Sequence, residues 1–100
     1  MSKKDNWTEK DEVTIKAIIV NMINQKQMFR DLGEGGELPQ SFNIQNTKNY
    51  VLGIFTGIVI NLFATYWVGE HETGLFPEDL KYLYHKIALS SDMIIEGIFE

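Results

Sequence analysis

The feature that most constrains this chain is a run of twenty residues without a charged side chain, from Tyr50 to Gly69. As an α-helix this run is about 30 Å long, which suits a buried helix and a membrane span equally well. In either case the flanking segments must supply the polar surface and most of the packing partners. The sequence therefore predicts a fold organised around one apolar central helix.

Both flanking segments carry apolar residues at steps of three and four, the spacing of one helix face. Thr8 followed by acidic residues is typical of a helix start, and so is Pro77 followed by Glu78 and Asp79. We expect helices over about 9–31, 47–68 and 77–98, with Gly69 ending the central one. In the first helix the apolar positions are Val13, Ile15, Ile18, Ile19, Met22, Ile23, Phe29 and Leu32.

Residues 33–46 combine three glycines with a proline, which neither a helix interior nor a strand interior tolerates well. This composition predicts a long loop between the first and central helices. The loop also contains the apolar residues Leu38 and Phe42. These side chains either fold back onto the core or contact a partner, and the sequence leaves both readings open.

Residues 1–100 show no change of composition that would mark a second domain. We expect a single all-α domain, a small three-helix bundle around the apolar central helix. The bundle has four helices if the last one breaks near Ser91, where Ser90, Ser91 and Asp92 can restart it. Apolar residues outside the main stripes, such as Val20 and Leu89, exceed what three short helices can bury. We therefore expect a homodimer or a larger assembly.

The central helix has one side of small residues, formed by Gly53, Gly57, Asn61 and Ala64 at helical spacing. Each glycine costs about 1 kcal/mol of helix propensity relative to alanine, which suggests a packing reason for keeping two of them. A side without bulky residues lets another backbone come unusually close. We expect these four residues to form a helix-packing or dimer face; the alternative is that they face water or a loop.

The net charge of −5 arises entirely from residues 70–100, which hold seven acidic residues against Lys81 and Lys86. No basic stripe is present to replace counterions on phosphates, so a nucleic-acid partner is not expected. The acidic residues Glu70, Glu72, Glu78 and Asp79 either bind a basic partner or simply keep the protein soluble. Together with Leu38, Pro39 and Phe42, they are the candidate partner-binding residues.

Motifs for catalysis or cofactor binding are absent from the sequence. His71 and His85 lack the spacing of a metal site, the glycines near residue 35 lack the lysine of a phosphate-binding loop, and no serine lies in a GxSxG setting. We expect no enzyme activity, no cofactor and no metal. The lack of cysteine and of a signal-peptide pattern favours a cytoplasmic protein.

These observations favour a small non-enzymatic protein-binding module that inhibits, adapts or regulates another protein, of the kind that mobile elements use against host machinery. The alternative is a small single-span membrane protein with residues 50–69 in the bilayer. Tyr66 and Trp67 resemble interfacial anchors in that case. Against it, Asn61 lies within the span, and both amphipathic flanking helices would lose their apolar partner.

Overall fold

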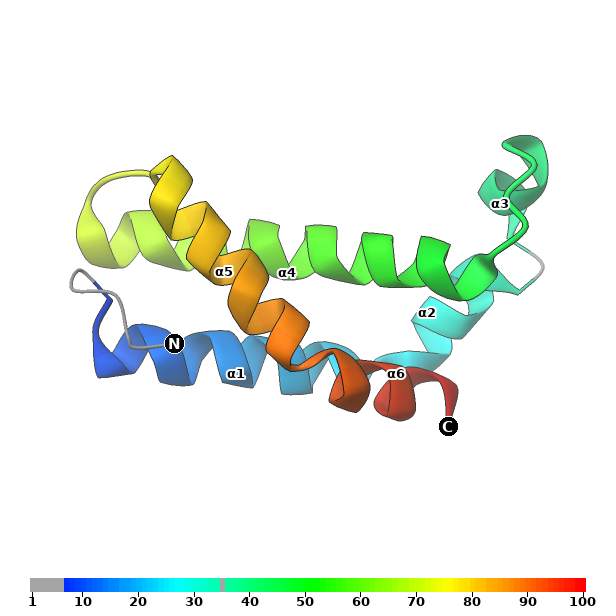
Figure 1. The fold of residues 1–100 in the computed structure, drawn as a ribbon, viewed down its shortest axis with the longest axis horizontal. Helices are drawn as coiled ribbons and strands as arrows, with labels where there is room; N and C mark the ends of the chain where they lie inside the picture. Colours follow the sequence, from blue (N-terminus) through cyan, green and yellow to red (C-terminus); the bar gives the residue numbers. More distant parts are fainter. Residues whose placement is uncertain (1–6, 35) are drawn as a thin grey trace.

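The structure, a computed structural model, is all-helical over residues 7–34 and 36–100, the part of the chain that it describes. Its elements are α1 (Glu9–Ile23), α2 (Lys26–Gly33), α3 (Glu37–Ser41), α4 (Thr47–His71), α5 (Pro77–Leu89) and α6 (Ser91–Phe99). α1 and α4 run in opposite directions along the long dimension of the molecule, and α5 crosses them (Figure 1). α2 and α6 pack against each other near the start of α4. The all-α prediction is confirmed.

α4 is the central element, and it buries one residue in every four. The buried side chains are Val51, Phe55, Val59, Phe63 and Trp67. Each four-residue step turns about 40° around a helix, so the buried stripe winds around α4 instead of running straight. Near its start α4 packs against α2, where the rings of Phe29 and Phe55 lie 5.2 Å apart, and along the rest it packs against α1.

The helix starts agree with the sequence signals. The Thr8 hydroxyl accepts a hydrogen bond from the Asp11 backbone N–H at 3.1 Å, and the Asp11 carboxylate accepts one from the Thr8 N–H at 2.9 Å. This reciprocal capping box fixes the start of α1. Asn46 caps α4 in a similar way by accepting from the Asn49 N–H at 3.0 Å, and Pro77 is the first residue of α5.

The helix expected over 9–31 is in fact two helices, because the chain bends at Asn24 and Gln25. No glycine or proline marks this bend. It redirects α2 so that Phe29 is fully buried and the guanidinium of Arg30 donates a hydrogen bond to the Ile98 carbonyl. The gain in tertiary contacts therefore outweighs the lost continuity of one helix.

Three further boundaries differ from expectation. The loop predicted over 33–46 contains the short helix α3, which tolerates Pro39 because this residue lies in its first turn. α4 continues past Gly69 to His71, and Glu72 adopts the left-handed conformation that ends it, with φ 60°. The last helix does break, but the residue between its halves is Ser90, and Ser91 is the first residue of α6.

The glycines that permit close approach are not the ones expected. A Cβ atom built at Gly53 or Gly57 has no neighbour within 4 Å, so neither is closely packed within the chain. A Cβ at Gly33 would lie only 2.6 Å from Cγ2 of Val51, and one at Gly97 would overlap Ile23. Close packing within the chain therefore occurs between α2 and α4 and between α1 and α6.

We predict that Gly33→Ala lowers the free energy of unfolding by about 1–3 kcal/mol, because Val51 is buried and its branched side chain cannot turn away easily. Gly69→Ala, in an exposed helical position with open space around its Cα, is the matched control and should raise stability by about 0.5–1 kcal/mol. Urea unfolding followed by circular dichroism measures both. Equal effects of the two substitutions would contradict the close α2–α4 contact.

Candidate functional site

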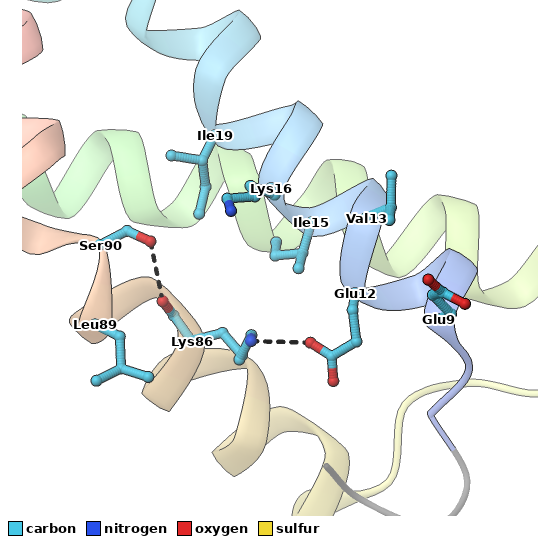
Figure 2. A pocket seen from close by; sticks show the side chains of 9 residues that line it. All are labelled: Glu9, Glu12, Val13, Ile15, Lys16, Ile19, Lys86, Leu89 and Ser90. Atoms are coloured by element: carbon cyan, nitrogen blue, oxygen red, sulfur yellow. Dashed lines mark hydrogen bonds and ion pairs between the residues drawn. The ribbon is translucent and has the colours of Figure 1, made fainter. Parts of the chain in front are cut away.

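A groove lies between α1 and the end of α5 (Figure 2). Its volume is about 360 Å³. We call it the α1/α5 groove; its lining residues are Glu9, Glu12, Val13, Ile15, Lys16, Ile19, Lys86, Leu89 and Ser90. The floor is formed by the buried Ile15 and Ile19, while Val13 and Leu89 stand at the rim, 61% and 69% exposed. The groove therefore presents aliphatic surface to solvent from two helices.

One ion pair ties the two walls of this groove together. Figure 2 shows the Lys86 ammonium of α5 reaching Glu12 of α1, with Nζ 2.9 Å from Oε2. The other oxygen of Glu12 accepts a hydrogen bond from the Tyr82 hydroxyl at 2.7 Å. Burial and this hydrogen bond to the Glu12 carboxylate raise the pKa of Tyr82 to about 12. Two partly buried polar contacts therefore link α1 to α5 at this groove.

Next to the groove, α1 and the end of α4 are joined through Asp11, whose side chain is fully buried. In addition to the Thr8 N–H, its carboxylate accepts hydrogen bonds from the Tyr66 hydroxyl at 2.6 Å and from Nε2 of His71 at 2.9 Å. The His71 ring also stacks on Trp67, with ring centroids 3.8 Å apart. One carboxylate thus fixes the first turn of α1 and two residues of α4.

The protonation state of this cluster follows from its geometry. Burial raises the pKa of Asp11, but the hydrogen bonds from Tyr66, the Thr8 backbone and His71 together outweigh it and hold the pKa below the usual 3.8. Burial and the bond to Asp11 raise the pKa of Tyr66 to about 12. Asp11 therefore acts as an acceptor only, and Nε2 of His71 must carry the hydrogen that it donates. This arrangement is a structural clamp in which the carboxylate is fully engaged.

Asp79, in the first turn of α5, is a second buried carboxylate. It accepts hydrogen bonds from the Trp7 indole N–H at 3.2 Å and from the Phe76 backbone N–H at 3.1 Å. The Trp7 ring packs against Phe63 and Tyr82, with centroids 5.1 and 4.6 Å away. Asp79 therefore caps α5 and anchors the segment that precedes α1.

The acidic face expected at residues 70–79 is smaller than the sequence implies. Glu72 and Glu78 are exposed, and the exposed Glu70 pairs with Lys10 of α1 at 2.8 Å. Asp79, by contrast, is only 1% exposed and cannot present its charge to a partner. The physical reason is that its side of α5 faces Trp7, whereas Glu78 points to solvent.

The other predicted partner-binding residues lie on α3 at the far end of the molecule. Leu38 and Phe42 are exposed, Phe42 by 67%, whereas Pro39 is buried. Pro39 therefore supports the fold instead of forming a contact surface. The α3 residues and the acidic residues lie at opposite ends of α4, so the structure does not bring them together (Figure 1).

The predicted packing residues of the central helix lie on its uncovered side. We call this side the outer face of α4; its residues are Gly53, Gly57, Asn61, Ala64 and Val68, all exposed except the half-buried Ala64. They lie opposite the buried stripe. α4 is long and apolar enough to cross a membrane, and only 28% of its most apolar 18-residue window is buried. One such helix is weak evidence for a span, because the core helix of a soluble protein passes the same test of length and composition, although such a helix is mostly buried.

Sequence reasoning missed the α1/α5 groove. The apolar spacing of the first helix predicts that Val13 is buried, but it is exposed. The apolar Leu89, outside the stripe of its helix, is the signal in the sequence that points to this groove. Over the described residues, no group of three or more histidine and acidic side chains is placed to hold a metal ion.

We predict that Asp11→Asn lowers the free energy of unfolding by roughly 1–3 kcal/mol at pH 7, because an amide cannot accept all the hydrogen bonds that converge there. Glu9→Gln, an exposed change in the same helical turn, is the control and should cost less than about 1 kcal/mol. Urea unfolding at several pH values measures both.

The same variants give a pH dependence with a definite sign. The pKa of Asp11 is lower in the folded chain than in the unfolded chain, so its contribution is fully present above pH 3.8 and is lost as the pH falls through the folded-state pKa. The unfolding free energy of the wild type should therefore fall more steeply below pH 4 than that of Asp11→Asn. Parallel curves for the two chains would show that Asp11 is not clamped as a carboxylate.

The geometry thus offers an aliphatic groove with charged edges, a fully engaged buried carboxylate cluster and an uncharged outer face on α4. The cluster holds the helices in place, and the other two are surfaces open to solvent. Comparison with known proteins gives no match: no protein-family model, curated protein or solved structure is similar to this chain.

Proposed function

We propose that this chain is a small non-enzymatic protein-binding module, and that the α1/α5 groove is where it holds its partner. The observation that carries the proposal is the exposure of Val13 and Leu89 on the two sides of a groove floored by Ile15 and Ile19. Aliphatic side chains that stand in solvent around a preformed hollow are typical of a docking surface.

The size and chemistry of the groove favour a helical segment of another protein. About 360 Å³ accommodates two or three aliphatic side chains, which an amphipathic helix presents at steps of three and four. The charged side chains at the edge, Glu9 and Lys16 on α1, can pair with polar residues beside those anchors. Burial of each aliphatic anchor contributes about 1.5–3 kcal/mol before the cost of association.

The finer expectations from the sequence belong to the same proposal. The module binds as a homodimer in the cytoplasm, and by occupying a surface of its partner it inhibits, adapts or regulates that protein. The support is the large area of apolar side chains left in solvent, which includes Phe42, Phe76 and Leu89. A bundle of this size covers them best by association.

A second candidate function rests on one specific observation, the long and largely uncovered α4. In a single-span membrane protein residues 50–69 lie in the bilayer, and α1 has to give up its packing against this part of α4. Fractionation of cells that express the chain separates the two candidates. A membrane-bound chain that only detergent releases would favour the span.

We predict that Leu89→Glu abolishes partner capture without unfolding the chain, because this side chain is exposed and its only role in the proposal is to contact the partner. The immobilised chain is exposed to a lysate of the source cells, and the bound proteins are compared by mass spectrometry. A protein held by the wild type should be recovered at least tenfold less with Leu89→Glu.

Ala88→Glu is the matched control, since it adds the same charge to the neighbouring exposed residue of α5 outside the groove. It should capture the same protein at the wild-type level. A set of captured proteins that is identical for both variants and the wild type would show that the groove does not bind a partner.

A further inference from the structure

We infer that the outer face of α4 binds the same face of a second copy of this chain, with the two α4 helices antiparallel and crossing near Gly57 and Asn61. This inference rests on the dimer in the proposed function but not on the α1/α5 groove. The first step is electrostatic. Between Lys48 and Glu70 no residue of α4 is charged, so two such faces meet without burying an unpaired charge.

The second step is the pattern of side chains along the face. A two-fold axis through the middle of α4, at Val59, places Gly57 of one copy opposite Asn61 of the other. Gly57 and Asn61 each lie two residues from Val59, about 200° around the helix, on the side away from the buried core. The space above Gly57 is open within the chain, so it can receive the larger Asn61 side chain. The face is therefore complementary to itself.

The third step concerns direction. An antiparallel pair sets the positive start of one helix against the negative end of the other. An antiparallel pair also keeps the acidic ends of the two α4 helices, with Glu70 and Glu72, apart, whereas a parallel pair would place these ends next to each other. Charge repulsion and helix dipoles therefore both favour the antiparallel arrangement.

The fourth step is the buried area. The 25 residues of α4 form a strip about 37 Å long and 10 Å wide, about half of the roughly 800 Å² per subunit that a stable interface buries. The remainder is available at both ends. Figure 1 shows α3 and the first turn of α5 on the side of α4 away from α1.

Exposed apolar side chains lie at both of these ends: Leu38 on α3, Phe42 directly after α3, and Phe76 at the start of α5. An antiparallel crossing brings α3 of one copy toward the start of α5 in the other. Phe42 can then pack on Phe76 of the partner subunit. The interface thus accounts for exposed aromatic residues at both ends of the molecule as well as for the uncovered middle of α4.

The test is the mass of the full chain in solution without detergent, measured by sedimentation equilibrium over a hundredfold range of concentration. The wild type should show twice the chain mass of 11.5 kDa. Gly57→Leu should weaken the dimer at least tenfold, since the new side chain fills the space that Asn61 of the partner subunit needs. Its circular dichroism should stay unchanged, because a Cβ at Gly57 meets nothing within the chain.

Ala17→Leu is the control. It adds a leucine at an exposed position of α1, two residues from the buried Ile15 and Ile19 and therefore on the side of α1 opposite its buried residues. It should remain dimeric. A wild type that is monomeric at every concentration, a chain that stays in solution only with detergent, or a Gly57→Leu variant that dimerises as well as the wild type would overturn the inference.

The orientation has its own measurement, because the chain contains no cysteine and accepts a single label at Asn49→Cys. Spin labels on two antiparallel helices that cross at Val59 should lie about 30 Å apart, whereas parallel helices would bring them close together. A short distance would overturn the antiparallel arrangement. Partner capture by the Gly57→Leu monomer separates the two proposals: if capture persists while dimerisation is lost, the groove does not depend on the dimer.

Discussion

The winding of the buried stripe on α4 is the constraint on which the rest of this fold depends. Because the five buried residues follow steps of four, the covered side turns by about 160° between Val51 and Trp67. No single straight helix can cover such a stripe. The chain covers it with α2 at one end, α1 along the rest, and the Trp7 ring on those of Phe63 and Trp67.

This constraint explains why the sequence predicts the existence of the helices better than their ends. The helix starts can be predicted from the sequence because their signals are local. Thr8 and Asn46 act through hydrogen bonds to nearby backbone, and Pro77 acts through its backbone preference. The bend at Asn24 and Gln25 has no such local signal, because it arises from the need to turn Phe29 onto Phe55. In the same way α4 continues past Gly69, because the contacts of His71 with Asp11 and Trp67 stabilise two more helical residues.

The candidate site was harder to predict, for a related reason. Glu78 and Asp79 have the same charge and are adjacent in sequence, yet one faces solvent and the other binds the Trp7 indole. Which of them is buried depends on the rotation of α5 relative to a residue 72 positions away. The α1/α5 groove likewise joins Val13 to Leu89. Neither segment alone encodes a groove, since the space between them is set by the Glu12–Lys86 ion pair and the helix crossing.

The glycines of this chain include some that lie at contacts between helices and others that lie in open space. Gly33 and Gly97 are where helices of this chain approach each other most closely, so their lack of a side chain is used within the fold. Gly53 and Gly57 cost helix propensity, and a Cβ atom built at either would meet nothing within 4 Å. Meanwhile the end of α4 is held to α1, because Asp11 accepts hydrogen bonds from Tyr66 and His71 and Lys10 pairs with Glu70. These contacts fix the outer face of α4 relative to α1. The proposed dimer covers this uncharged face, which is rich in small residues, and leaves the contacts between α1 and α4 in place.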